Sequence, residues 1–190
     1  MTADHLPKQA ILDGESLVFS RPSPAGVEKY HHLVVNQRHL KIICTLVDDT
    51  YGYESTIRAP LEAGIWIVNA ITSLLLPLSE GGTSSSTFSL EYNDGKVKLT
   101  IRRTTSVEAD HDPGFTLYDL GNQRGDARPD SVAWSDRMLF DSGLFAALQR
   151  VGTQAASIRG IQAPRVESLT IRPNWMGASP LDTPPLELPK

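Results

Sequence analysis

Basic and apolar side chains alternate in the segment KVKLTIRR, residues 96–103. Successive side chains of a strand point to opposite faces, so Val97, Leu99 and Ile101 would share one face of a strand. The pattern therefore predicts a basic face on the other side. We assign to this basic strand face Lys96, Lys98, Arg102 and Arg103, with Lys41, Arg38 and His39 as counterparts in the earlier segment VNQRHLKIICTL, residues 35–46.

Such a face could bind a single-stranded nucleic acid, because cations follow the phosphates while aromatic rings stack on the bases. Tyr92, at the end of the preceding segment, is the first candidate for a stacking ring, and Tyr30 and Phe88 are the others. The alternative is a solvated outer face whose cations pair with acids on neighbouring strands. The acidic balance of the whole chain favours this second interpretation.

Two other groups of residues could hold a metal ion. The segment VEADHDPG, residues 107–114, spaces three carboxylates at alternate positions, but the spacing of the glycine and of the final glutamate in a calcium loop is missing. His31 and His32 are adjacent, so they point to opposite faces of a strand and do not form a zinc pair. We therefore predict no metal site and no cofactor.

No pattern typical of an enzyme is present. The chain contains no glycine-rich phosphate loop, no cysteine pairs with zinc spacing and no nucleophile elbow. The single cysteine, Cys44, lies in an apolar run and is expected to be buried. Without a convergent set of acid, base and nucleophile, we do not expect catalysis.

Composition limits the class of protein further. The net charge of −4 over 190 residues excludes a globally basic nucleic-acid binder, so only local basic surfaces could serve that purpose. The N-terminus has neither a basic region nor an apolar region of a signal peptide. The apolar stretch GIWIVNAITSLLLPL is short for a membrane span. We expect a cytoplasmic protein that does not contact a membrane.

The first half of the chain reads as strands followed by a helix. β-branched runs separated by polar turns predict hairpins, and Pro60 is suited to open a helix because its missing N–H costs nothing there. Pro77 would end the helix. The predicted strands cover residues 15–20, 29–35, 39–47 and 53–58.

The second half repeats this order. Strands are expected at 87–92, 96–103 and 115–120, and a helix at 140–152 with Asp141 or Ser142 as N-cap and Gly152 at its end. Residues 121–136 have no clear pattern and are expected to be irregular. Residues 165–173 could form a last strand.

Two short alignments suggest an internal duplication. Asn36 aligns with Asn93, and EAGIW, residues 62–66, aligns with DSGLF, residues 141–145. The fold class we predict is α+β, with two antiparallel-sheet-plus-helix repeats packed as one pseudo-symmetric domain. The expected divisions are an arm (1–14), a first repeat (15–78), a linker (79–86), a second repeat (87–152) with an acidic insertion (104–139), an extra strand region (153–173) and a Pro-rich tail (174–190).

The order of elements in VNQRHLKIICTL…IRAPLEAGIWIVNAI and YNDGKVKLTIRR…LFDSGLFAALQRV resembles the Whirly-type and Pur-type single-stranded nucleic-acid-binding superfamily. The resemblance covers roughly residues 15–152 and implies an oligomer that binds unstructured single strands. The Lys-Gly-Lys-Ala motif of the plant members is absent, so no binding residue carries over from the family.

Two functions remain open from the sequence. The first is a non-enzymatic protein that binds single-stranded DNA or RNA, or associates with nucleic acid, as a homo-oligomer. The alternative is a protein-interaction or assembly module that binds no nucleic acid and whose tail, SPLDTPPLELPK, engages a protein partner as an extended peptide. The paired lysine-bearing hairpins favour the first function, and the net acidity favours the second.

Overall fold

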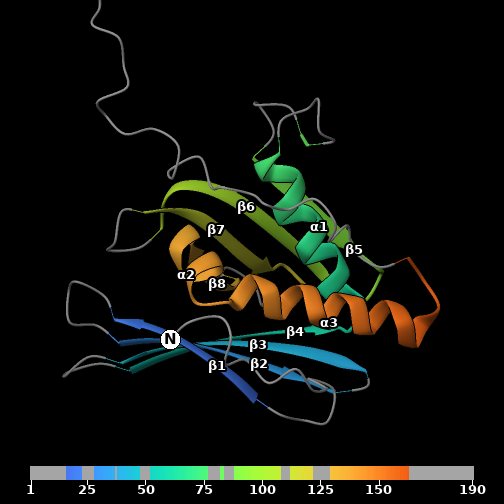
Figure 1. The fold of residues 1–190 in the computed structure, drawn as a ribbon, viewed down its shortest axis with the longest axis horizontal. Helices are drawn as coiled ribbons and strands as arrows, with labels where there is room; N and C mark the ends of the chain where they lie inside the picture. The colour runs from blue at the N-terminus through green and yellow to red at the C-terminus, as the bar shows by residue number, and fades with distance from the viewer. Residues whose placement is uncertain are drawn as a thin grey trace, which may run out of the picture.

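The computed structural model describes residues 16–22, 28–36, 38–47, 52–76, 82–83, 88–107, 112–121 and 129–162. Within these residues the chain forms two four-stranded antiparallel sheets and three helices (Figure 1). The α+β class expected from the sequence is therefore confirmed. The predicted arm, the strand at 165–173, the tail and most of the linker lie outside the described residues.

The first sheet is a meander with strand order β1-β2-β3-β4, in which all neighbouring strands are antiparallel. One helix follows it. Pro60 ends the last strand rather than opening the helix, which begins after a turn at Leu61 and Glu62. The elements are β1 Ser16–Pro22, β2 Glu28–Val35, β3 His39–Val47, β4 Gly52–Pro60 and α1 Ala63–Leu75.

The second sheet is also a meander, with strand order β5-β6-β7-β8, and two helices follow it. The order of four antiparallel strands and then helix thus occurs in both halves of the described chain. The elements are β5 Ser89–Asn93, β6 Lys98–Val107, β7 Asp112–Asp119, β8 Asp130–Ser135, α2 Asp136–Asp141 and α3 Leu144–Arg159.

Much of the region 104–139 is regular structure and not an insertion between elements. β6 continues to Val107, and residues 130–136, which the sequence predicts to be irregular, form β8 and the first residue of α2. The register shifts between Thr104 and Val107, which interrupts the alternation that would have extended the predicted strand. The buried residues of β8, Val132 and Trp134, do alternate, but they follow a run of glycine, proline and charged residues typical of a loop.

The last helix differs from its prediction at both ends. α3 begins at Leu144, and its N-cap is Gly143 with a φ of 84°, not Asp141 or Ser142. It continues beyond Gly152 to Arg159. Glycine inside a helix weakens it by only about 1 kcal/mol relative to alanine, and the helix formers that follow Gly152 and the packing of this face on α1 outweigh that cost.

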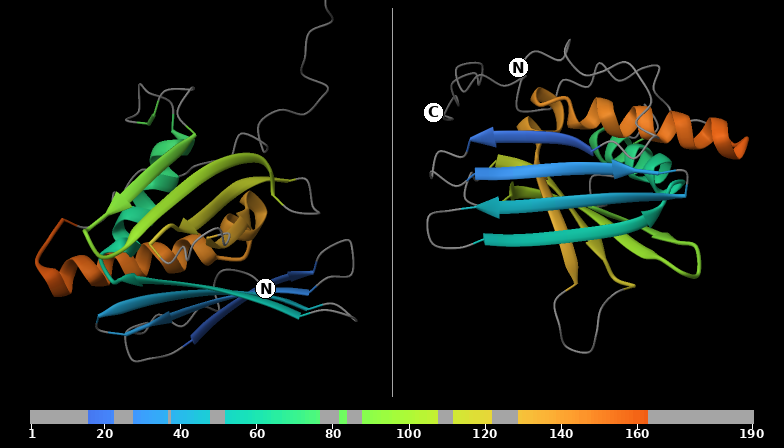
Figure 2. Two further views of the ribbon diagram at one scale, coloured as in Figure 1. Left: turned by 180° about the vertical axis from the view of Figure 1, so that it is seen from behind. Right: turned by 90° about the horizontal axis from the view of Figure 1, so that it is seen from below.

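The first sheet buries one face. Leu33, Ile42 and Ile57 pair in register across β2, β3 and β4, and all three side chains are fully buried. Val34, Lys41 and Arg58 form the neighbouring row, which faces the other way because side chains alternate. Figure 2 (right) looks onto this second face, with the strands in front of the described helices. We call it the outer face of the first sheet.

The helices and the inner faces of both sheets share one hydrophobic core. α1 packs on β5, β6 and α3, and α2 packs on β7 and β8. α3 runs between the two sheets in Figure 1. The largest fully buried side chains are Trp134 and Phe115, which pair in register across β7 and β8.

None of the helices in the described residues has both the length and the apolar character needed to cross a membrane.

The outer edge of β8 is covered by the first sheet. The backbone N–H of Ser131 donates to Ser55 Oγ at 3.2 Å, and Lys29 Nζ donates to the carbonyl oxygen of Ala133 at 2.8 Å. These two backbone groups point away from β7, so they would otherwise be open for another strand to pair with. The contacts join the sheets and remove this edge as a site for strand addition.

His31 lies on the same buried face as Lys29, beside this seam. The side chain is fully buried, and neither ring nitrogen has a hydrogen-bond partner. Burial, followed by the positive charges of Lys29 and His32, lowers the pKa of His31 well below 6.5. The folded protein therefore holds this imidazole neutral.

We expect this neutral imidazole to make stability depend on pH. As the pH falls below about 6.5, His31 binds a proton in the unfolded chain but stays neutral in the folded protein. The free energy of unfolding should then fall by up to about 1.4 kcal/mol per pH unit, and should not change from this cause above pH 7. Urea unfolding at pH 7.5 and 5.5 measures the slope, and His31→Leu should reduce it. An equal slope in both proteins would contradict the prediction.

The two hairpins close on the same side-chain-stabilised turn. Asn36 Oδ1 accepts from the backbone N–H groups of Arg38 and His39, at 2.9 and 2.7 Å. Asp94 Oδ1 accepts from those of Lys96 and Val97, both at 2.8 Å. The turn chemistry therefore equates Asn36 with Asp94, one residue beyond the Asn93 that the sequence alignment chose.

Candidate nucleic-acid interface

Lys98 and Arg102 lie on the side of β6 that faces away from the core. Both are exposed, whereas Leu99 and Ile101 between them are fully buried. Their neighbours in register are short polar residues, including Thr116 opposite Arg102. We define the outer face of β6 and β7 as Lys98, Thr100, Arg102, Thr104, Thr116 and Tyr118.

Lys98 and Arg102 form no ion pair with another residue of the part of the chain that the structure describes. The ion pairs between described residues join Arg103 to Asp136, Arg137 to Asp112 and Arg159 to Glu62, and none includes Lys98 or Arg102. The nearby strand β5 contributes one acid, Glu91, which lies opposite Thr100. The face thus keeps a positive charge that a phosphate could neutralise.

Tyr118 lies on the same face, between the two cations along the sheet. It pairs in register with Thr100, the residue midway between Lys98 and Arg102, and its side chain is partly exposed. Tyr118 was not among the stacking rings expected from the sequence. The signal was present in FTLYDL, where Phe115 and Leu117 alternate with Thr116 and Tyr118.

Lys96 lies in the turn before β6 and not on the strand face. It is exposed, and its backbone N–H binds the carboxylate of Asp94. The N–H groups of Val97 and Lys96 lower the pKa of Asp94, so the carboxylate stays charged in this turn. Lys96 therefore lies beside the acid of the turn and not among the cations of the strand face.

Tyr92 is on the opposite side of the sheet from Lys98. Its ring packs against Trp66 of α1, with centroids 5.5 Å apart and planes inclined at 45°. Its hydroxyl donates to Asp94 Oδ2 at 3.3 Å. Burial, together with the charge of Asp94, raises the pKa of Tyr92 to about 12. The prediction that Tyr92 stacks beside the basic strand face is therefore wrong.

Arg103 also lies on the inner side, so its assignment to the basic strand face is wrong. Its guanidinium makes a two-pronged ion pair with Asp136, in which Nη1 bonds Oδ1 and Nη2 lies 2.7 Å from Oδ2. The guanidinium carbon lies 4.6 Å from the centre of the Phe115 ring. With Asp136 only 1% exposed, this pair is a structural element and not a surface for ligands.

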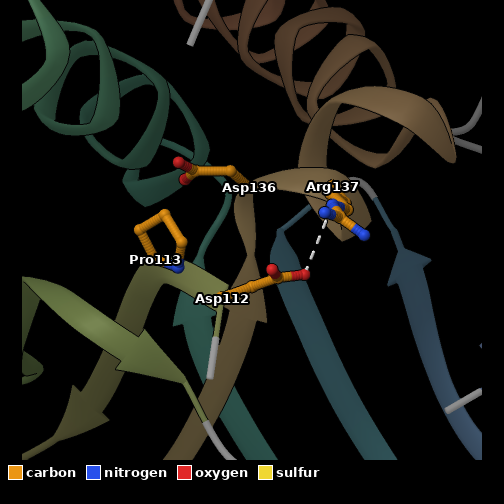
Figure 3. Close-up of a pocket in the computed structure, with 4 residues that line it drawn as sticks. All are labelled: Asp112, Pro113, Asp136 and Arg137. Carbon is orange, nitrogen blue, oxygen red and sulfur yellow. Dashed lines mark ion pairs between the residues drawn. The ribbon is translucent and has the colours of Figure 1, made fainter. Parts of the chain in front are cut away.

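Beside this ion pair is a cavity of about 140 Å³ lined by Asp112, Pro113, Asp136 and Arg137 (Figure 3). Its acids have cationic partners, because Arg137 Nε lies 3.5 Å from Asp112 Oδ2 and Arg103 holds Asp136. No cluster of three or more metal-ligating side chains occurs in the described part of the chain. The cavity gives no basis for a catalytic or metal site.

Lys41 belongs to the other sheet. It lies on the outer face of the first sheet and pairs in register with Arg58. Lys41 and Lys98 therefore occupy corresponding places in the two halves but lie on separate surfaces. Of the residues assigned to the basic strand face, the structure brings together only Lys98 and Arg102, with Lys96 in the adjacent turn.

No protein-family model matches the chain. No curated protein matches it either.

Proposed function

We propose that this protein binds single-stranded nucleic acid through the outer face of β6 and β7. The observation that carries the proposal is that two exposed cations, Lys98 and Arg102, lie on either side of Tyr118 and form no ion pair with any described residue. Thr116 lies opposite Arg102 on this face, and its hydroxyl can donate to a phosphate oxygen.

The spacing of these residues suits a nucleic-acid strand that runs along β6, beside Tyr118 of β7. Lys98 and Arg102 are four residues apart on one strand, or about 13 Å. Their charges would contact separate phosphates, while a base stacks on Tyr118 between them. Such contacts do not distinguish bases by their hydrogen bonds, so we expect little sequence preference.

The two halves support a more specific proposal about origin. We propose that they are duplicated sheet-plus-helix units of one pseudo-symmetric domain, related to the Whirly-type and Pur-type proteins. The matching order of elements and the two matching turns, at Asn36 and Asp94, support this proposal. The proposed membership implies that the protein acts as an oligomer.

The second candidate function is an assembly module without nucleic-acid binding. The observation that favours it is the outer face of the first sheet, where Val34 and Ile43 are only partly exposed and lie beside Lys41. An assembly role requires that the outer face of β6 and β7 binds no polyanion.

Titration of labelled oligonucleotides separates the two functions. We expect an increase in the fluorescence anisotropy of single strands of about 10 nucleotides, which matches the site sizes of sheet surfaces that stack bases. Duplexes of the same length should bind more weakly, because their paired bases cannot stack on Tyr118. Equal binding of both forms would indicate a general polyanion surface, and no binding of either would favour the assembly module.

A further inference from the structure

The outer face of the first sheet carries charges of opposite sign at its two ends. Across β2, β3 and β4, the side chains form three rungs in register. The first rung is Tyr30, Thr45 and Glu54, the middle rung is His32, Ile43 and Thr56, and the last rung is Val34, Lys41 and Arg58.

The positive end has no acid among the described residues of its rung to balance it. Lys41 and Arg58 are directly opposite each other across β3 and β4, and like charges in that position destabilise a sheet. Neither forms an ion pair with a described residue. Glu54 is exposed and accepts only a hydrogen bond from Thr56, at 3.3 Å. Among the described residues, neither the cations of the last rung nor Glu54 of the first rung has an oppositely charged partner.

We propose that this face is the interface of a homodimer, with its two-fold axis along the middle rung. The axis lies between the first sheets of the two copies and is perpendicular to their strands. The strands of one copy therefore run in the opposite direction to those of the other. This arrangement places Glu54 of one copy against Arg58 of the other, twice. The middle rung of one copy faces the middle rung of the other, so Ile43 packs on Ile43 of the second copy.

The composition of the face favours a second copy over other occupants. A nucleic acid would gain from Lys41 and Arg58 but would be repelled by Glu54 at the other end. A second copy places Glu54 against Arg58 at both ends, while Lys41 faces Thr45, and it covers the aliphatic side chains of Val34 and Ile43. Each contact away from the axis occurs twice by symmetry, so one pair of residues supplies two ion pairs.

The size of the face sets the expected affinity. Four strands of up to nine residues cover about 600 Å² per copy, which is at the low end of specific interfaces. We therefore expect a dimer that dissociates at micromolar concentrations. This inference identifies the surface behind the proposed oligomer. It does not depend on nucleic-acid binding, because the outer face of β6 and β7 belongs to the other sheet.

Sedimentation velocity over a range of concentrations tests the dimer, and charge reversal tests its geometry. Glu54→Arg and Arg58→Glu should each be monomeric at concentrations where the unaltered protein is dimeric, because each variant brings like charges together. An equimolar mixture of the two variants should recover the dimer. In that heterodimer, a copy positive at both positions faces a copy negative at both.

Lys98→Glu is the matched control, since it reverses a charge on the second sheet and should leave dimerisation unchanged. Circular dichroism would establish that all variants are folded. The proposal is overturned if the unaltered protein stays monomeric at about 100 μM, well above the dissociation constant expected for this interface. It is also overturned if the single variants dimerise normally or if their mixture stays monomeric. Oligonucleotide binding does not enter these outcomes, so the proposed function is tested separately.

Discussion

Arg103→Met is expected to destabilise the protein by about 3 kcal/mol, since it leaves the carboxylate of Asp136 buried without its cation. Asp136 is in the first turn of α2, where backbone N–H groups compensate part of its charge. For this reason we expect the low end of the range usual for broken buried ion pairs. Urea unfolding monitored by circular dichroism measures the loss.

The neighbouring arginine provides the control. Arg102→Met changes the same residue type one position away but on the exposed face, so the free energy of unfolding should change by less than about 0.5 kcal/mol. Adding Asp136→Asn to Arg103→Met should restore at least about 1 kcal/mol, because it removes the unpaired charge. Equal effects of the two single variants would contradict the assignment of Arg103 to the inner side.

Reversal of both cations on the outer face of β6 and β7 should abolish most nucleic-acid binding. In Lys98→Glu/Arg102→Glu, two attractions of about 1 kcal/mol each become repulsions of similar size. The sum corresponds to a loss of affinity of at least about 100-fold after screening by salt. Anisotropy titration with a single strand of about 10 nucleotides measures it.

A variant with the same change in net charge distinguishes a local surface from a general effect of charge. Lys41→Glu/Arg58→Glu reverses two cations on the outer face of the first sheet. If phosphates bind where we propose, this variant should lose less than about tenfold in affinity, or about 1.4 kcal/mol. Similar losses in the two double variants would show that net charge, not the face around Tyr118, controls binding.

The sequence predicted the strands that alternate and lack interruptions. Hairpin β2–β3 was placed nearly to the residue, because its apolar spacing is strong and its turn contains Asn. Helix α1 was recognised from its apolar spacing, but it begins at Ala63 and not at Pro60. β8 could not be recognised, because its alternation extends over only Val132 and Trp134 and a loop-like segment precedes it. The length of α3 could not be read either, since Gly152 has the appearance of a helix end.

Only part of the candidate site was predicted correctly, because alternation along one strand shows some of its residues and not others. Alternation separates Lys98 and Arg102 from Arg103, and applying it strictly would have placed Arg103 on the inner side. Its partner Asp136 could not have been found, because it lies 33 residues away on an element that the sequence did not predict. The contact of Tyr92 with Trp66 likewise depends on where α1 crosses β5, which local pattern does not determine.

The salt dependence of single-strand binding tests the central proposal most directly. Each phosphate contact should add about 0.7 to the slope of log affinity against log salt concentration. The account predicts that Lys98→Gln/Arg102→Gln lowers this slope by about 1.4 relative to the unaltered protein, while Tyr118→Ala weakens binding at every salt concentration without changing the slope. Equal slopes for the unaltered protein and the double variant would contradict phosphate binding at this face.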